Sequence, residues 1–212
     1  MTTLVVVDDQ FLIRDGVAAI LAAEEDFTVL GTAADGAEAV GLITSLVPDV
    51  ALMDIRMPEV DGIEATRRIV ESGCATRILI LTTFGADDYV LAALRAGASG
   101  YLLKDAPRES LVAGIRAVAA GDVAVEKGVL AQLVRGQPVR QRPEVVAALG
   151  RLSPRESEVL HLVAQGATNP EIARSLFIGE TTVKTHVSRI QTKLDARDRV
   201  QLVVIAHRAG VA

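Results

Sequence analysis

The chain has 212 residues, enough for two domains, and half of them are hydrophobic with one cysteine, Cys74, which excludes an intramolecular disulfide. No signal-peptide pattern opens the sequence and no apolar run approaches the roughly 18 residues of a membrane span, so we expect a soluble cytoplasmic protein with no membrane partner. The net charge of −5 is unevenly placed, because residues 1–122 carry 9 basic and 19 acidic residues whereas residues 151–212 carry 9 and 6, which favours two domains with different partners.

Five short apolar runs in the first 122 residues predict buried β-strands. They are rich in Val, Ile and Leu and nearly continuous, as in strands covered on both faces, and they span residues 3–7, 27–31, 49–53, 77–81 and 99–103. Amphipathic stretches predict helices at about 11–23, 35–46, 62–71, 86–96 and 107–120. This alternation predicts an α/β doubly wound parallel five-stranded sheet as the first domain, residues 1–121.

Polar residues follow four of these strands, where ligands bind in such a sheet. Asp8 and Asp9 follow the first, Asp54 the third, Thr82 the fourth and Lys104 the fifth. Clustered carboxylates need a cation, their oxygens suit Mg²⁺, and an aspartate beside the metal can attack a phosphoryl group. Each residue alone is more often a cap, a turn residue or a solvated side chain, but together they favour a phosphoryl-transfer site.

The motifs VVVDDQ, LMDIRMPEVDGIEA, LTTF and GASGYLLKD resemble the receiver domain of bacterial response regulators. The resemblance implies that Asp54 is the phosphoacceptor. It further implies that Asp9 binds Mg²⁺ directly, that Asp8 holds a metal-bound water and that the backbone carbonyl of Arg56 completes the protein ligands.

The same resemblance assigns roles to three further residues. Thr82 and Lys104 would contact the phosphoryl group, and Tyr101 would be the aromatic residue that switches position. An alternative reading is a phosphatase of the haloacid-dehalogenase type, which also uses an aspartate nucleophile with Mg²⁺. Such enzymes carry Asp-x-Asp at the nucleophile, whereas this chain has Asp54-Ile55-Arg56.

Residues 122–151 are predicted to be a linker. The stretch RGQPVRQRP contains glycine, two prolines and three arginines with little apolar content, which is typical of an exposed tether. Short helices are predicted as options at 129–134 and in the segment EVVAALG.

Residues 152–212 are predicted to form a small all-α four-helix domain. Ser153 and Glu156 have the spacing of a capping box at the first helix, and Asn169 and Asp198 are the expected caps of the second and fourth. The third and fourth helices are expected at about 180–194 and 198–209.

The third of these helices is the candidate DNA-binding element. Its polar side presents cations and short hydroxyls, and no acid lies between Thr181 and Leu194. A preceding helix and tight turn fit a recognition helix that enters a major groove, whereas a solvated polar face is the ordinary alternative. Its predicted buried stripe is Val183, Val187, Ile190 and Leu194.

The segment LSPRESEVLHLVAQGATNPEIARSLFIGETTVKTHVSRIQTKLDARDRVQLVVIAHRAG resembles the LuxR-type helix-turn-helix domain, and with the receiver it implies the NarL/FixJ subfamily. By this resemblance the base-facing residues are Lys184, Thr185 and Ser188. The phosphate-contact candidates are Arg155, Thr182 and Arg189. The fourth helix would be a dimer seam formed by Val200, Val203 and Val204.

We therefore expect a DNA-binding transcriptional response regulator, and not a turnover enzyme, that a sensor histidine kinase phosphorylates on Asp54. Phosphorylation would control formation of a homodimer and its binding to double-stranded promoter DNA. A second alternative is a DNA-binding regulator with a vestigial receiver that acts without phosphorylation.

Overall fold

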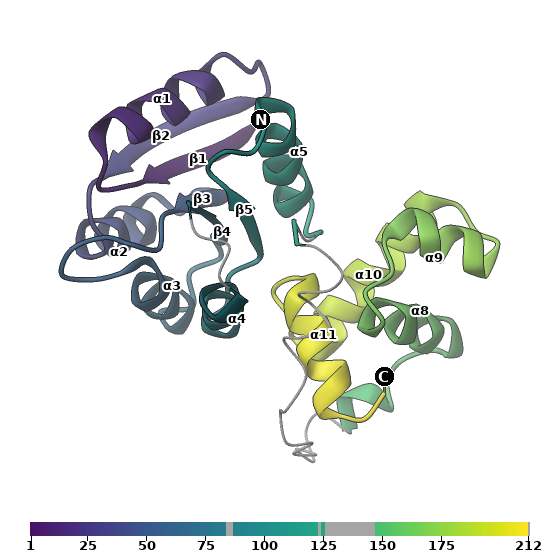
Figure 1. Ribbon diagram of the computed structural model, residues 1–212. Coiled ribbons are helices and arrows are strands. Elements are labelled where there is room, and N and C mark those ends of the chain that lie inside the picture. Colours follow the sequence, from purple (N-terminus) through teal and green to yellow (C-terminus); the bar gives the residue numbers. More distant parts are fainter. Residues whose placement is uncertain (84–86, 123, 126–146, 212) are drawn as a thin grey trace. The chain divides into compact units, whose positions relative to one another are not determined.

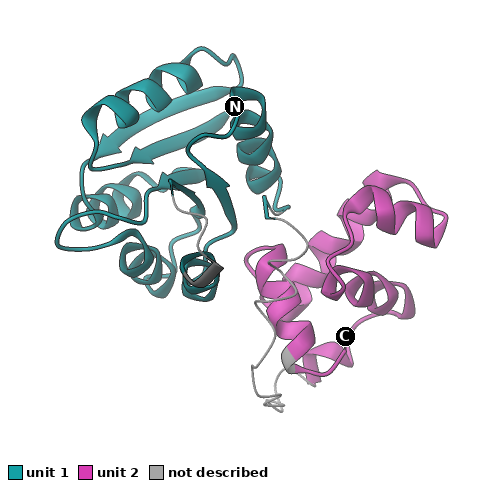
Figure 2. Cartoon of the chain, viewed as in Figure 1, with its two compact units in different colours: residues 1–125 teal, residues 126–212 magenta. Residues whose placement is uncertain are grey.

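The computed structural model describes residues 1–83, 87–122, 124–125 and 147–211. The chain divides into two compact units, residues 1–125 and 126–212 (Figure 2). The predicted helix at 129–134 and the segment RGQPVRQRP at 135–143 lie outside the described residues. Within the described part, no helix combines the length and apolar character needed to cross a membrane.

The first unit is built on a parallel sheet of five strands, as predicted. The strand order is β2-β1-β3-β4-β5, so the chain reverses direction across the sheet between β1 and β3. The strands are β1 (Thr2–Val7), β2 (Phe27–Ala33), β3 (Val50–Met53), β4 (Arg77–Thr82) and β5 (Gly100–Leu103). The reversal between β1 and β3 is the place where ligands bind in sheets of this topology.

Helices cover both faces of this sheet (Figure 1). The first and last helices lie on one face and the other three on the opposite face, which encloses the apolar strands between two layers. The helices are α1 (Phe11–Ala22), α2 (Gly36–Leu46), α3 (Gly62–Glu71), α4 (Asp87–Ala96) and α5 (Arg108–Ala119). All five lie within two residues of the predicted ranges.

A glycine lets α3 begin directly beside the end of β3. A Cβ atom placed on Gly62 would lie 1.8 Å from the backbone oxygen of Asp54, which no real side chain tolerates. The Gly62 N–H donates to the Ile55 carbonyl at 2.9 Å. This contact fixes the loop that carries Asp54 and Arg56 close to the sheet.

The second unit is all-helical, with α8 (Pro154–Ala164), α9 (Asn169–Leu176), α10 (Glu180–Leu194) and α11 (Arg199–Arg208). The predicted capping box is confirmed at α8, where the Ser153 N–H donates to Glu156 at 2.7 Å. Residues 147–149 are also helical, and Ala148 and Leu149 pack against the core of this unit.

The predicted cap of α9 was wrong by one residue. Thr168 is the N-cap, and its backbone N–H donates to Glu171 at 2.7 Å in a second capping box. Asn169 is instead the first helical residue and is 6% exposed. Its Oδ1 accepts a hydrogen bond from Arg199 Nη1 at 2.8 Å, so this side chain joins α9 to α11 and does not cap a helix.

Candidate functional site

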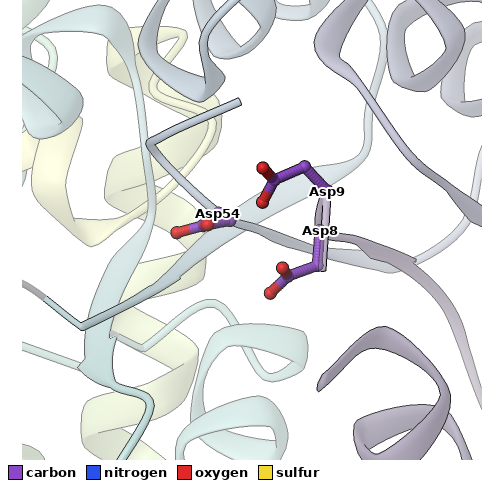
Figure 3. A group of neighbouring side chains, drawn as sticks. All are labelled: Asp8, Asp9 and Asp54. Atoms are coloured by element: carbon purple, nitrogen blue, oxygen red, sulfur yellow. The ribbon is translucent and has the colours of Figure 1, made fainter. Parts of the chain in front are cut away.

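Three carboxylates converge at the carboxyl ends of β1 and β3. One oxygen from each of Asp8, Asp9 and Asp54 lies within 4.8 Å of the others (Figure 3). Asp8 is 2% exposed and Asp54 is 4% exposed, whereas Asp9 is open to solvent. The topology therefore brings together residues that are 45 positions apart in the sequence.

Backbone hydrogen bonds hold the two buried acids in place. The Asp8 N–H donates to the Ala33 carbonyl at 3.1 Å, and the Asp54 N–H donates to the Val7 carbonyl at 2.9 Å. The Asp8 carboxylate accepts the Gln10 N–H at 3.0 Å. Both acids thus continue the hydrogen-bond ladder of the sheet, so their side chains start from fixed positions.

Lys104 supplies the cation of the pocket. Its Nζ atom lies 2.6 Å from Asp8 Oδ2 and 2.9 Å from Asp54 Oδ2, and the lysine side chain is only 6% exposed. The Lys104 N–H donates to the Thr82 carbonyl at 2.9 Å, which fixes the backbone from which the side chain reaches across. A buried ammonium between two carboxylates is paired on both sides.

The pKa values of this cluster follow from burial and pairing. Burial raises the pKa of the Asp8 carboxyl, and the hydrogen bonds from Lys104 and from the Gln10 N–H only partly offset that effect. Burial alone would lower the pKa of Lys104, but the hydrogen bonds to Asp8 and Asp54 outweigh it and raise that pKa. The lysine therefore stays charged.

Thr82 ends β4 beside this cluster with an unused hydroxyl. The residue is 1% exposed, and its Oγ1 has no hydrogen-bond partner among the described residues. An unpaired buried hydroxyl costs about 1–3 kcal/mol, so a structure that keeps one is suited to an incoming hydrogen-bonding group. A phosphoryl oxygen held by Lys104 would be such a group.

The carboxylates fit a Mg²⁺ site. Asp8 and Asp54 are buried acids, Asp9 faces solvent, and the loop after Asp54 offers backbone carbonyls such as that of Arg56. Several hard oxygen donors with room for water are what this ion requires. The exposed Arg56 side chain stacks its guanidinium 5.5 Å from the centre of the Tyr89 ring, on α4.

Tyr101 was predicted as a residue of the site, whereas Arg14 was not. Tyr101 is half-buried on β5, and burial raises the pKa of its phenol. Arg14 was not predicted, yet its Nη1 donates to the backbone carbonyl of Asp8 at 2.7 Å. Arg14 lies in the first turn of α1, five residues after Asp9, and this position alone did not mark it in the sequence.

The candidate recognition helix α10 has the predicted two-sided character. Its stripe of Val183, Val187, Ile190 and Leu194 is buried in the core of the second unit. Gly179 is the N-cap and makes no side-chain capping bond. The opposite side is open to solvent at Thr182, Lys184, Thr185, Ser188 and Arg189.

Two contacts of Lys193 anchor α10 against its neighbours. Lys193 Nζ lies 2.7 Å from a carboxylate oxygen of Glu156 and 3.1 Å from the Arg151 carbonyl. The hydrogen bond from Lys193 and the capping bonds of Ser153 lower the pKa of Glu156 to about 2. Sequence reasoning missed this pair, because the two residues are 37 positions apart.

Arg155 is held within the unit. Its guanidinium donates to Glu158 at 2.6 Å and to the Leu176 carbonyl at 2.5 Å, and the side chain is 35% exposed. These contacts steady the end of α9, which leads into the turn before α10.

The dimer seam on α11 stays a prediction. Val203 is 1% exposed and belongs to the apolar core of the second unit, so this side chain is already packed within its own fold. Val200 is 2% exposed. Val204 is the member of the predicted trio that remains partly exposed.

Comparison with known proteins gives matches in both units. Residues 4–116 match the family model described as a response regulator receiver domain, and residues 150–206 match that of bacterial regulatory proteins of the luxR family. The transcriptional regulatory protein LiaR of Bacillus subtilis is 41% identical over 98% of both chains. The nitrate/nitrite response regulator protein NarL of Escherichia coli is 35% identical over 99% of this chain and 96% of its own.

Solved structures match as well. The response regulator ChrA of a heme-sensing two-component system covers 100% of this chain and 98% of its own, with a TM-score of 0.53 and 36% identity. The receiver domain of a response regulator from Mycobacterium tuberculosis covers 57% of this chain and 97% of its own, with a TM-score of 0.55 and 38% identity.

Proposed function

The chain belongs to the response-regulator family, as a transcriptional regulator with a receiver domain and a LuxR-type DNA-binding domain, and from this we propose that phosphorylation of Asp54 controls its binding to promoter DNA. The observation that supports this most is the pairing of Lys104 with both Asp54 and Asp8. At the end of β4, the Thr82 hydroxyl has no hydrogen-bond partner within the described part of the chain. In a receiver that no longer accepts a phosphoryl group, catalysis would not require Lys104, Asp8 and Asp54 to lie together.

The acid pocket can accept a phosphoryl group in one displacement. An Asp54 carboxylate oxygen attacks the phosphorus of a donor, the new O–P bond forms, and the bond to the leaving group breaks. The donor would be a phosphohistidine of a sensor histidine kinase. Lys104 neutralises a phosphoryl oxygen, and the Thr82 hydroxyl donates to another. When bound to Asp9 and its neighbours, Mg²⁺ neutralises further negative charge.

The exposed side of α10 provides the output. Lys184, Thr185 and Ser188 would face base edges in the major groove, whereas Thr182 and Arg189 would bind the phosphate backbone. Arg155 is a further candidate for a phosphate contact, and its guanidinium also donates to the Leu176 carbonyl at the end of α9. A homodimer would place two such helices on a two-fold DNA site.

Two other functions are less well supported. A phosphatase of the haloacid-dehalogenase type needs a second acid two residues after the nucleophile, and Arg56 stands there with its guanidinium on Tyr89. A regulator independent of phosphorylation would not need the cluster of Asp8, Asp54 and Lys104 as a whole.

The direct test is covalent modification by a small acyl phosphate. With Mg²⁺ and acetyl phosphate, we expect the intact mass to rise by one phosphoryl group, and Asp54→Asn should remove this gain. Asp15→Asn, at an exposed position on α1, is the matched control and should be modified like wild type. Modification of Asp54→Asn to the wild-type extent would refute the assignment of the phosphoacceptor.

A further inference from the structure

The chain that leaves α5 turns back and pairs with the edge of the sheet. Ala124 forms a parallel bridge with Gly100, and the Tyr101 N–H donates to the Ala124 carbonyl at 2.9 Å. Since β5 is the edge strand, this contact occupies its outer side. Ala124 lies beyond residue 121, where the receiver domain was predicted to end, and at the start of the segment that leads to the second unit.

Two glycines, Gly100 on β5 and Gly114 on α5, make room for the side chain of Ala124. A Cβ atom placed on Gly100 would lie 3.2 Å from Ala124 Cβ, and one placed on Gly114 would lie 3.5 Å from it. Ala124 also packs against the apolar core that α5 shares with the sheet. Because Gly100 and Gly114 have no side chains, the methyl group of Ala124 can pack close to both β5 and α5.

The same short strand ends in the acid pocket. β5 has only four residues, and Lys104 follows it directly, with its ammonium on Asp54 and Asp8. At about 3.3 Å per residue, Tyr101 and Lys104 are roughly 10 Å apart along the chain. Lys104, the cation of the pocket, therefore follows one end of β5, and Tyr101 near the other end is bonded to Ala124.

Phosphorylation must change the pocket end of this strand. When Asp54 becomes an acyl phosphate, its carboxylate loses its charge, and the new phosphoryl oxygens attract Lys104 in its place. The Lys104 N–H donates to the Thr82 carbonyl, and among the residues that the structure describes the Thr82 hydroxyl has no partner. Because β5 has only four residues, a displacement at Lys104 would act within three residues of Tyr101.

We infer that Ala124 is a positioning residue for the phosphorylation switch. Its carbonyl ties the start of the interdomain segment to the Tyr101 N–H, and phosphorylation of Asp54 weakens this hydrogen bond, which we call the Ala124 tie. The inference rests on the proposed function. Because coupling is reciprocal, loosening the tie also favours the phosphorylated state. A purely structural role, in which Ala124 only covers an exposed sheet edge, would produce no such coupling.

Amide hydrogen exchange in the wild-type full chain tests the coupling without any mutation. The Tyr101 N–H is bonded to Ala124, whereas the nearby Ser99 N–H is bonded to the Ile78 carbonyl of β4 at 2.8 Å. With Mg²⁺ and beryllofluoride, a phosphoryl mimic, Tyr101 should exchange about 5-fold faster or more, and Ser99 should not change. Equal exchange of Tyr101 with and without the bound mimic would overturn the inference.

A variant tests the reverse direction. Ala124→Leu should open the tie, seen as fast exchange at Tyr101, and should tighten beryllofluoride binding about 5-fold or more. Ala37→Leu, the same change at an exposed position of α2, should bind the mimic like wild type. An open tie with wild-type affinity would overturn the inference and leave the proposed function standing. Failure of the wild type itself to bind the mimic would overturn the inference, and acetyl phosphate labelling of Asp54 then tests the proposed function separately.

Discussion

Lys104 Nζ lies 2.6 Å from Asp8 Oδ2, although Lys104 follows the edge strand β5 and Asp8 follows β1, three positions away in the sheet. The lysine also contacts Asp54, which follows β3, so one cation joins the ends of three strands. This pairing lets two buried acids remain in place, and it is the arrangement that a phosphoryl group on Asp54 would have to rearrange.

Removing that cation should destabilise the first unit. Lys104→Gln leaves Asp8 and Asp54 buried without their partner, and we expect a loss of roughly 3 kcal/mol in its free energy of unfolding. Urea unfolding followed by tyrosine fluorescence measures this unit alone, since both tyrosines of the chain, Tyr89 and Tyr101, lie in it. Mg²⁺ should restore more stability to the variant than to wild type, and an unchanged unfolding midpoint would contradict the pairing.

Mg²⁺ should stabilise the first unit through Asp9. At a concentration tenfold above its dissociation constant the ion should add about 1.4 kcal/mol, and most of this gain should disappear in Asp9→Ala. Without the ion, the variant should be at least as stable as wild type, because one of three clustered negative charges is gone. Asp15→Ala removes an exposed acid from α1 and serves as the control, with an undiminished response to Mg²⁺. A full response in Asp9→Ala would remove Asp9 from the ligand set.

The stability of the second unit should depend on pH through Glu156. Its pKa of about 2 lies below the ordinary 4.5, so the charged carboxylate stabilises the folded unit above pH 4.5, and this stability is lost as pH falls towards 2. Glu156→Gln keeps the capping geometry without the charge and should cost about 2 kcal/mol at pH 7. The difference from wild type should vanish near pH 2. Proton NMR of the three histidines, all in this unit, follows its unfolding, and a pH-independent difference would contradict the assignment.

Two variants of α10 should weaken DNA binding in different ways. Arg189→Ala should reduce the slope of log affinity against log salt by about 1, because one phosphate contact is lost. Lys184→Ala should cost about 1–3 kcal/mol and relax base preference. Arg67→Ala removes an exposed cation from α3 of the other unit and is the control. Binding to fragments selected from genomic DNA over a range of salt concentrations separates the effects, and identical behaviour of all three variants would argue against a base-reading role for Lys184.

The sheet and the acid pocket could be predicted because each depends on a pattern that repeats along the chain. Apolar strands alternated with helices, and polar residues followed the strands, so a parallel sheet had to bring Asp8, Asp54 and Lys104 to one edge. The pattern could not predict which side chains within the pocket would bond to one another. That Lys104 bonds to both acids depends on side-chain reach across the sheet.

Elsewhere the local signals were ambiguous. Thr168 and Asn169 are both good cap residues, so composition could not choose between them, and the buried bond to Arg199 decided the outcome. In α11, apolar residues occur on several sides of the helix, so spacing could not show that Val203 packs in the core of its own unit. The pairing of Ala124 with β5 had no sequence signal, because it depends on how the chain turns after α5.

The most direct test of the account is DNA binding by the full chain before and after phosphorylation. Genomic fragments are incubated with wild type and with Asp54→Asn, each with and without Mg²⁺ and acetyl phosphate, and the retained fragments are sequenced. We expect phosphorylated wild type to enrich a set of fragments that share a two-fold motif, and we expect Asp54→Asn not to respond to the phosphoryl donor. Retention of the same fragments with equal affinity in all four samples would contradict control of DNA binding by Asp54.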